Sequence, residues 1–394
     1  MKVDFFLHSL TSSEYAPRIG QVLDTPFLTS GAVGKAVEAQ LCEFFGVGDA
    51  MLVNSWTNGA LAVLLALGIG PGDEVIVPAM TFIATANVVE LLGAKPVFVD
   101  VNPDTLLLEP AAVAAAITPR TRAIVPVHLY GQMCDMQGFR DVSQERPGIA
   151  VIEDCAHCFE GSRDGCLPGR YSTAAIFSFY ATKNVTCGEG GAVIVNSPEL
   201  AAKVRQTRLH GMSQGAVDRF ERGEYRHWDM PVLGVKANLP DLLAAYLEPQ
   251  IATVRERLPK RQAIANRYRA AFQGTSIRMQ KLLPACSSAE HLFPIAAPPA
   301  VRDEAIAALT RRDIGVAVNY RSVPTLTYYR EKYGYRPDSF PVSYEWGAGT
   351  LTLPLYPALE AEKQDWVISS VLEEVAPLCR DAAEPAIAPA TASR

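Results

Sequence analysis

Residues 174–196 read AAIFSFYATKNVTCGEGGAVIVN, with two apolar runs on either side of a loop. Neither run alternates polar with apolar residues, and such continuous runs are typical of strands buried on both faces of a sheet. Lys183 follows the first run almost directly, and glycines precede the second. The stretch therefore predicts two buried strands joined by a loop that carries one lysine at the end of the first strand.

Similar apolar runs recur upstream, separated by helical segments such as ALAVLLALG and PAAVAAAI. These runs occupy residues 74–80, 95–101, 123–129 and 149–154. Apolar strands that alternate with helices predict an α/β fold, with a mostly parallel sheet covered by helices on both faces. Ligands of such sheets bind beyond the carboxyl ends of the strands. Asp154, Lys183 and the loop after Met80 all lie at such ends.

The composition is that of a globular protein, with 49% hydrophobic and 20% charged residues. The net charge is −6 and basic residues are scattered, so we expect no nucleic-acid partner. No apolar run approaches the roughly 20 residues that span a bilayer, and the first residues make a poor signal peptide. Because the eight cysteines are irregularly spaced, we expect reduced thiols and a cytoplasmic location.

A chain of 394 residues is too long for one simple core, so we expect two domains. The boundaries that the pattern predicts are a large domain over 1–250 and a smaller C-terminal domain of helices and short strands over 251–380. A tail rich in Ala, Pro and Ser over 381–394 is predicted to be disordered. The polar stretch 207–237 predicts a long loop, and long loops are often functional.

Two charged residues at strand ends suggest chemistry. Burial around Lys183 lowers the pKa of an amine and makes it nucleophilic, although a lysine can also simply extend from a strand end to solvent. Asp154 ends the apolar strand in IEDCAH; a carboxylate there can hold a proton on a heterocyclic nitrogen, as pyridoxal phosphate (PLP) requires, or cap a helix or bind a metal.

The pair Cys155 and Cys158 is a weak zinc or redox candidate, and we expect no metal site.

The segment NSWTNGALAVLLALG passes from small polar residues into a helix. A helix N-terminus of this kind binds phosphate through backbone N–H groups, but Ser55, Thr57 or Asn58 can equally serve as plain N-caps. Ser178 can add a hydroxyl to the same phosphate. Phe82 can lie against an aromatic cofactor or pack in the core. Together with Lys183 and Asp154 these residues favour a PLP site.

Five blocks of the chain resemble the DegT/StrS family of sugar aminotransferases, over roughly residues 20–375 and in the order found in that family. The resemblance implies a fold-type I PLP-dependent transferase. The blocks are NSWTNGALAVLLALGIGPGDEVIVPAMTFIATAN (54–87), PRTRAIVPVHLYGQMCDM (119–136), VIEDCAH (151–157), FSFYATKN with GEGGAVIV (177–195) and LTLPLYP (351–357).

The resemblance also implies roles around the cofactor ring. In the family's S-F-x-x-x-K block, Lys183 is the Schiff-base lysine and catalytic residue. Asp154, also catalytic, pairs with the pyridine nitrogen. His157 takes the position beside the 3-oxygen of the ring, and Phe82 stacks on the ring.

Four further residues match phosphate-binding positions of the family. Thr57 and Asn58 match the phosphate-binding loop, and Ser178 matches the phosphate-binding serine. Asn238 in GVKANLPD resembles an asparagine that reaches the phosphate of the neighbouring subunit. The resemblance therefore implies a homodimer with shared active sites.

The chain departs from the family pattern at two places. Trp56 and Asn58 stand in a loop that usually reads S-G-T-x-A-L, and Thr325 stands where a histidine is usual. Tyr320 and Arg321 are candidate sugar contacts, with packing or surface roles as the alternative.

The resemblance implies transfer of an amino group from L-glutamate to a keto-sugar in two half-reactions. A nucleotide-linked keto-deoxyhexose is the acceptor that the resemblance favours. The alternatives are an unlinked cyclitol ketone, a PLP-dependent sugar dehydratase, or a binding protein on the same fold. The retained Lys183 favours transamination, because the dehydratases of this family carry histidine in its place.

Overall fold

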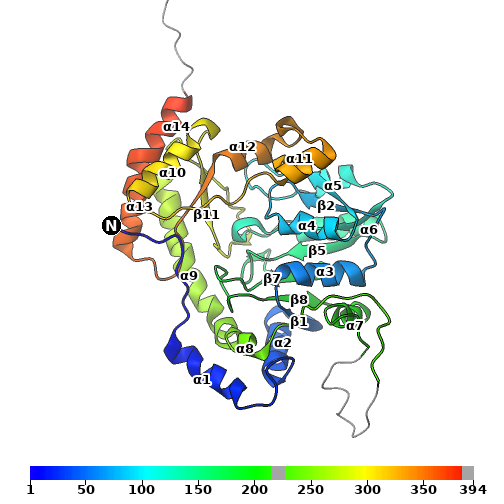
Figure 1. Cartoon of the computed structure of the whole chain (residues 1–394). Coiled ribbons are helices and arrows are strands. Elements are labelled where there is room, and N and C mark those ends of the chain that lie inside the picture. Colours follow the sequence, from blue (N-terminus) through cyan, green and yellow to red (C-terminus); the bar gives the residue numbers. More distant parts are fainter. Residues whose placement is uncertain (214–226, 384–394) are drawn as a thin grey trace, which may run out of the picture.

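A computed structural model describes residues 1–213 and 227–383, and a seven-stranded sheet forms its larger part (Figure 1). Its strand order is β1-β8-β7-β5-β4-β2-β3. β8 pairs antiparallel with both neighbours, and the other pairings are parallel. The predicted α/β fold is confirmed. The strands are β1 (Asp49–Val53), β2 (Glu74–Pro78), β3 (Lys95–Val99), β4 (Thr121–Ile124), β5 (Ala150–Asp154), β7 (Ala174–Ser178) and β8 (Gly191–Val195).

Helices cover both faces of this sheet, as its apolar strands require. Along β2, Val75 and Val77 pack with helices α3, α4 and α7, whereas Ile76 between them faces the opposite side with α5 and α6. Helix α2 covers the β1–β8–β7 end of that second face. These helices are α2 (Ala32–Phe45), α3 (Trp56–Ala66), α4 (Ala84–Leu91), α5 (Pro110–Ala116), α6 (Met136–Glu145) and α7 (Pro198–Thr207).

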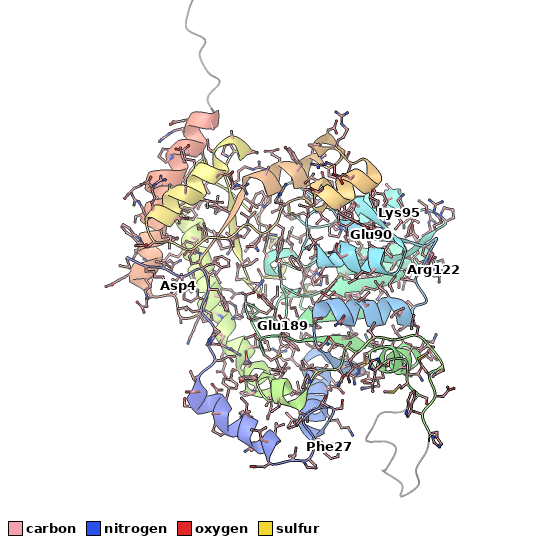
Figure 2. All side chains as sticks on the ribbon, viewed as in Figure 1. Asp4, Phe27, Glu90, Lys95, Arg122 and Glu189 are labelled. Carbon is pink, nitrogen blue, oxygen red and sulfur yellow. The ribbon has the colours of Figure 1, made fainter. Side chains whose placement is uncertain are left out.

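A loop joins β7 to β8 and carries Lys183; its Glu189 is labelled in Figure 2. Where the two strands pair, Ser178 lies opposite Gly191. A Cβ atom on Gly191 would lie 2.5 Å from the Phe177 carbonyl oxygen and 3.0 Å from the Trp56 backbone nitrogen. Only glycine permits this approach, which brings the start of α3 against the end of β7.

A second, antiparallel sheet lies in the C-terminal part, in the order β12-β11-β9. It has its own apolar cluster with the surrounding helices. Figure 1 shows α9 running from α8 up to α10 and α13. The predicted division into two domains, with its boundary at residue 250, stays a prediction. These elements are β9 (Arg278–Met279), β11 (Phe293–Ala296), β12 (Thr350–Leu353), α8 (Asp241–Ala244), α9 (Leu247–Phe272), α10 (Arg302–Arg311), α13 (Ala361–Ser370) and α14 (Ala376–Ala383).

Shorter elements complete the described chain. They are α1 (Ser12–Leu23), α11 (Thr327–Tyr333), α12 (Pro341–Gly349), the paired short strands β6 (Ser162–Arg163) and β10 (Cys286–Ser287), and several single turns of helix. No helix within residues 1–213 and 227–383 is both long and apolar enough to cross a bilayer. The cytoplasmic location stays a prediction.

Two predicted irregular segments fall partly outside the described residues. In the predicted loop 207–237, α7 ends at Thr207, and the described residues after it form isolated bridges only. Residues 214–226 lie outside the description. Of the predicted tail 381–394, the first three residues belong to α14 and the rest lie outside the description.

Candidate active site

Lys183 and Asp154 lie at the same edge of the large sheet. Asp154 ends β5, which pairs in parallel with β7, and Asp154 itself lies opposite Ile176. Lys183 follows β7 by five residues, and its backbone N–H donates to the Tyr180 carbonyl oxygen at 2.9 Å. Because parallel strands end at one edge, a residue from each strand reaches the same place, as the sequence predicted.

The environment of the Lys183 amine favours its neutral form. Burial lowers its pKa from the usual 10.5 to about 8, while the negative charge of Asp154 opposes that shift. Near pH 8 about half of the side chains are then neutral amines, which act as nucleophiles and bases. The role of Lys183 toward a cofactor stays a prediction.

Asp154 is almost fully buried, with 4% of its surface exposed. Thr85 Oγ1 donates to its Oδ2 at 2.9 Å, and the Ala156 backbone N–H donates to its Oδ1 at 3.1 Å. Burial raises the carboxyl pKa, and these two donors together with Lys183 oppose the rise. Within the described residues no Lys or Arg forms an ion pair with Asp154, so the carboxylate remains available to a cationic ligand group.

His157 is held in one neutral tautomer. The Tyr130 backbone N–H donates to His157 Nδ1 at 3.1 Å, so Nδ1 carries the lone pair and Nε2 carries the hydrogen. Nε2 lies 3.0 Å from the Tyr320 hydroxyl oxygen, which accepts that hydrogen. Burial and the charge of Lys183 lower the pKa of His157 well below its ordinary value. The ring is therefore a neutral hydrogen-bond donor.

Two of the predicted substrate and stacking residues join this group, and one does not. The Phe82 ring is 52% exposed and lies 5.6 Å from the Tyr320 ring, centroid to centroid. Tyr320 thus connects Phe82 to His157. Arg321 is exposed, and within the described residues it forms no hydrogen bond or ion pair with another predicted site residue. Its sugar contact stays a prediction.

The N-terminus of α3 lies beside Ser178. Ser55 is the N-cap, because its Oγ accepts from the Asn58 backbone N–H at 3.1 Å. The Trp56 and Thr57 amides precede the first hydrogen bond within the helix and have no helical acceptor. Ser178 pairs with Gly191, where an added Cβ atom would lie 3.0 Å from the Trp56 amide nitrogen. The predicted phosphate-binding residues therefore converge, although the Asn58 side chain donates to Asn54 Oδ1 at 2.9 Å.

Asn238 lies near this helix start in its own chain. It forms an isolated antiparallel bridge with Val53, and its Nδ2 lies 2.9 Å from Thr29 Oγ1 and 3.2 Å from Ser30 Oγ. Its Oδ1 is buried without a hydrogen-bond partner among the described residues. Its role toward a partner subunit stays a prediction.

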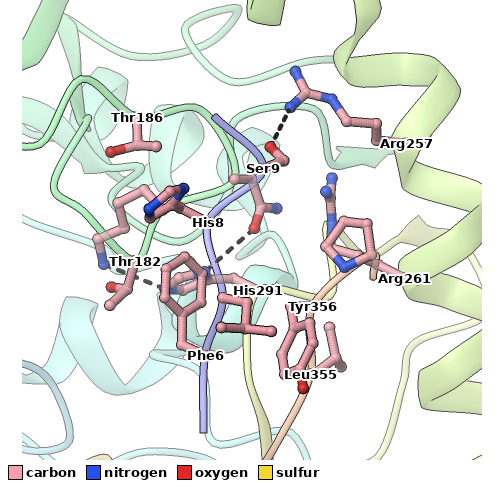
Figure 3. A pocket seen from close by; sticks show the side chains of 14 residues that line it. Phe6, His8, Ser9, Thr182, Thr186, Arg257, Arg261, His291, Leu355 and Tyr356 are labelled. Carbon is pink, nitrogen blue, oxygen red and sulfur yellow. Dashed lines mark hydrogen bonds between the residues drawn. The ribbon is translucent and has the colours of Figure 1, made fainter. Parts of the chain in front are cut away.

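The sequence did not predict His291, which lies against Lys183. His291, labelled in Figure 3, has its Nε2 3.4 Å from Lys183 Nζ. Its ring centroid is 4.6 Å from that of His157. His291 precedes β11 of the second sheet and is 108 positions away from Lys183. The only feature of the sequence that could have indicated His291 as a site residue is its place as a lone histidine at the start of the apolar run HLFPIAA.

A family model, the DegT/DnrJ/EryC1/StrS aminotransferase family, matches residues 10–372. This match covers nearly the whole chain. The chain belongs to that family. It is thereby a member of a family of PLP-dependent sugar aminotransferases, as the resemblance implied.

Solved structures agree with this assignment. DesV from S. venezuelae, solved in complex with a ketimine intermediate, is 33% identical, with coverage of 92% of this chain and 94% of that chain and a TM-score of 0.84. Spr1654 from Streptococcus pneumoniae in its PMP form is 27% identical, with coverage of 96% and 100% and a TM-score of 0.88. PseC from Helicobacter pylori, an aminotransferase involved in the biosynthesis of pseudoaminic acid, is 25% identical, with coverage of 95% and 99% and a TM-score of 0.86.

The side chains at this edge fit PLP in chemical type. A partly neutral lysine suits an aldehyde, and the buried Asp154 without a paired cation suits a protonated ring nitrogen. The neutral His157 offers an N–H donor, and the uncapped amides of α3 suit a phosphate. Cys155, His157, Ser178 and Lys183 line one cavity.

A neighbouring cluster with metal-ligand residue types is already satisfied by protein contacts. Ligand atoms of His128, Glu153 and Cys155 lie within 4.8 Å of one another. His128 Nδ1 accepts from the Cys134 N–H at 3.2 Å, so Nε2 donates to Glu153 at 2.7 Å. All eight cysteines are free, and burial raises the pKa of Cys155 and Cys158 well above the ordinary value. These contacts favour a structural role for the cluster.

Proposed function

We propose that the chain binds PLP at Lys183 and transfers an amino group from L-glutamate to a keto-sugar. The acceptor that we propose is a nucleotide-linked keto-deoxyhexose. The observation that carries the proposal is the Lys183 amine, with its pKa lowered to about 8, at the same sheet edge as the buried carboxylate of Asp154. An amine and a carboxylate so placed are the two groups that PLP chemistry needs from a protein.

In this proposal Lys183 carries the proton that the reaction moves. When bound, PLP supplies the carbonyl that receives the amino group and a ring that accepts electrons from the substrate carbon. The Lys183 amine takes the proton from the donor Cα as a general base and returns it as a general acid. Asp154 keeps a proton on the ring nitrogen, and Thr85 and the Ala156 amide hold its carboxylate in place.

The remaining predicted residues would hold the cofactor. His157 Nε2 carries the hydrogen that Tyr320 accepts, and it would donate this hydrogen to the ring oxygen when PLP is bound. Phe82, with half of its surface exposed, offers a face for stacking. The Thr57 amide, the Asn58 side chain and the Ser178 hydroxyl would bind the phosphate.

The cavity beside Lys183 supports an acidic amino donor. Figure 3 shows Arg257 and Arg261 among its lining residues, together with His8 and Tyr356. Arg261 is paired with Glu160, but Arg257 forms no ion pair among the described residues. A cationic side chain such as Arg257 in the cavity of the reacting amine favours a dicarboxylic acid such as glutamate over a neutral amino acid. On the acceptor side, Tyr320 lies between Phe82 and His157 and is the sugar contact that we propose.

We further propose a homodimer in which Asn238 contributes to the partner's phosphate site. Asn238 Oδ1 has no hydrogen-bond partner among the described residues, so it is available to another group. Large apolar side chains are exposed in nearby segments, with 49% exposure for Phe27 and Leu28 and 47% for Tyr180. Leu28 directly precedes Thr29, which contacts Asn238. Covering such side chains favours association.

The first test is the visible absorption spectrum of the purified protein supplied with PLP. We expect a yellow band from lysine-bound PLP that bleaches on addition of L-glutamate and persists with L-alanine. A protein that stays colourless with PLP would overturn the proposed enzyme. Bleaching by alanine but not glutamate would overturn the proposed donor.

The second test identifies the acceptor. The glutamate-treated protein is offered either a nucleotide-linked keto-deoxyhexose or an unlinked inosose, and the yellow band is followed. We expect its return, with an aminated product, for the nucleotide-linked sugar. Return with the inosose alone would identify a cyclitol aminotransferase, and release of water from the sugar without consumption of a second amino group would identify a dehydratase.

A further inference from the structure

His291 contacts the amine of Lys183 from the second sheet. Its side chain lies just before β11 and is 95% buried, and Nε2 lies 3.4 Å from Lys183 Nζ. Figure 3 shows this contact as a dashed line within the cavity that both residues line. A hydrogen bond of this length is weak, and it joins a nitrogen of His291 to the amine of Lys183.

Asn184 determines which nitrogen of His291 carries the hydrogen. Asn184 Nδ2 donates to Glu160 Oε1 at 3.1 Å and to the Ala289 carbonyl oxygen at 3.0 Å. Its Oδ1 therefore faces His291 Nδ1, at 3.3 Å. An amide oxygen only accepts, so Nδ1 carries the hydrogen and Nε2 presents a lone pair to Lys183.

A buried ion pair fixes Asn184 in turn. Arg261 pairs with Glu160, and both side chains are almost completely buried. Arg261 Nε also donates to the Ala289 carbonyl oxygen at 3.1 Å, the same oxygen that Asn184 uses. Asn184 cannot rotate its amide without leaving a buried carboxylate short of a donor, which is costly.

The charges around His291 keep its ring neutral. Burial and the positive charges of Lys183 and Arg261 lower its pKa well below the ordinary value. His157, the other titratable side chain against the ring, is neutral as well. Across the cavity lie His8, Arg257 and Tyr356, and Cys155 lines the second cavity that His291 also borders. A neutral ring with a lone pair at Nε2 can only accept a hydrogen bond from the lysine.

We propose that His291 is a positioning residue for Lys183, whose Nε2 accepts a hydrogen bond from the protonated amine and holds Nζ while it carries the transferred proton. This inference rests on the proposed proton-carrying role of Lys183. His291 itself neither gains nor loses a proton. Asn184, Glu160 and Arg261 serve the same purpose by fixing the tautomer of the ring.

The decisive measurement is the pKa of Lys183 in the full-length protein without PLP. The rate at which trinitrobenzenesulfonate labels Lys183 is followed against pH by peptide mass spectrometry. Because a hydrogen bond to an ammonium stabilises the charged form, His291→Leu should lower the pKa of Lys183 by about one unit. His291→Gln keeps an acceptor near the Nε2 position and should restore the wild-type value. His210→Asn, at an exposed histidine, is the matched control.

A second measurement determines the tautomer of His291 in the wild-type protein and uses a variant only to assign its signals. In protein with ¹⁵N-labelled histidine, His291 should show the chemical shifts of the neutral Nδ1–H tautomer, identified by the signals that His291→Gln removes. The Nε2–H tautomer, or a Lys183 pKa that is the same in the Leu and wild-type proteins, would overturn the inference. Either result leaves the glutamate-dependent bleaching intact, whereas failure of the proposed function would abolish bleaching in the wild type.

Discussion

Thr85 Oγ1 donates a 2.9 Å hydrogen bond to Asp154 Oδ2, and it lies 2.9 Å from Thr81 Oγ1. A carboxylate only accepts, so the Thr85 hydroxyl gives its hydrogen to Asp154 and accepts one from Thr81. The loop after β2 and the first turn of α4 thus orient the carboxylate that ends β5. This contact couples the segment that carries Phe82 to the acid that we place at the ring nitrogen.

Replacement of Thr85 by valine should therefore impair Asp154 without removing it. The loss of one donor raises the pKa of the buried carboxyl further, because Thr85 now opposes the effect of burial. We expect kcat/KM to fall roughly tenfold, with its acid limb moved to higher pH, since the protonated acid cannot hold a cationic ring. Thr85→Ser keeps the hydroxyl and should retain the wild-type profile. Equal pH profiles for Val and Ser would contradict the role of this bond.

Lys183→Ala should abolish transamination. Loss of the group that moves the proton costs on the order of a thousand-fold or more in kcat. Borohydride reduction followed by peptide mass spectrometry should place the pyridoxyl group on Lys183 in the wild type and on no peptide of the variant. Lys203→Ala, at an exposed lysine of α7, is the control and should behave as the wild type. Wild-type activity in Lys183→Ala would make the assignment wrong.

The strand ends were predictable from the sequence, because continuous apolar runs mark buried parallel strands wherever they occur. Asp154 ends one such run and Lys183 follows another, so their meeting at one edge follows from the topology of parallel strands. The family resemblance added His157 and Asn238. Strand β1 was not predicted, since the short DAMLV starts with an acid and lies at the edge of the sheet.

The partners of these residues were not predictable for a physical reason. In the sequence, Thr85 is an ordinary residue in the first turn of a helix. Its hydroxyl reaches Asp154 only because α4 packs against the sheet. His291 reaches Lys183 across 108 positions because the second sheet docks against the first. Contacts of this kind depend on how helices and strands pack against one another. The local pattern of apolar and polar residues in the sequence does not predict that packing.

The capture of PLP by the PLP-free protein should depend on pH through Lys183. Since the neutral amine attacks, the rate should rise with pH and be half-maximal near pH 8, the pKa that burial gives Lys183. Asp154 raises that pKa, so Asp154→Asn should move the half-maximal point to lower pH. Glu189→Gln removes an exposed acid from the same loop and should leave it in place. A half-maximal point near pH 10 in the wild type would contradict the lowered pKa.

Mixing two inactive variants would test whether active sites are shared. If Asn238 reaches the partner's phosphate, a hybrid dimer of Lys183→Ala and Asn238→Ala contains one site with both native residues. Random exchange makes half of the dimers hybrid, so about one quarter of wild-type activity should return on mixing.

The same experiment separates the shared site from an internal one. If Asn238 serves only its own chain, where it contacts Thr29 and Ser30, no site in the mixture regains both residues and activity stays at the level of the single variants. Mixing Lys183→Ala with Asp154→Asn is the control. Both of these residues belong to one chain's sheet edge, so no hybrid site is whole and no activity should return. Recovery in the first mixture alone therefore assigns Asn238 to the partner's site.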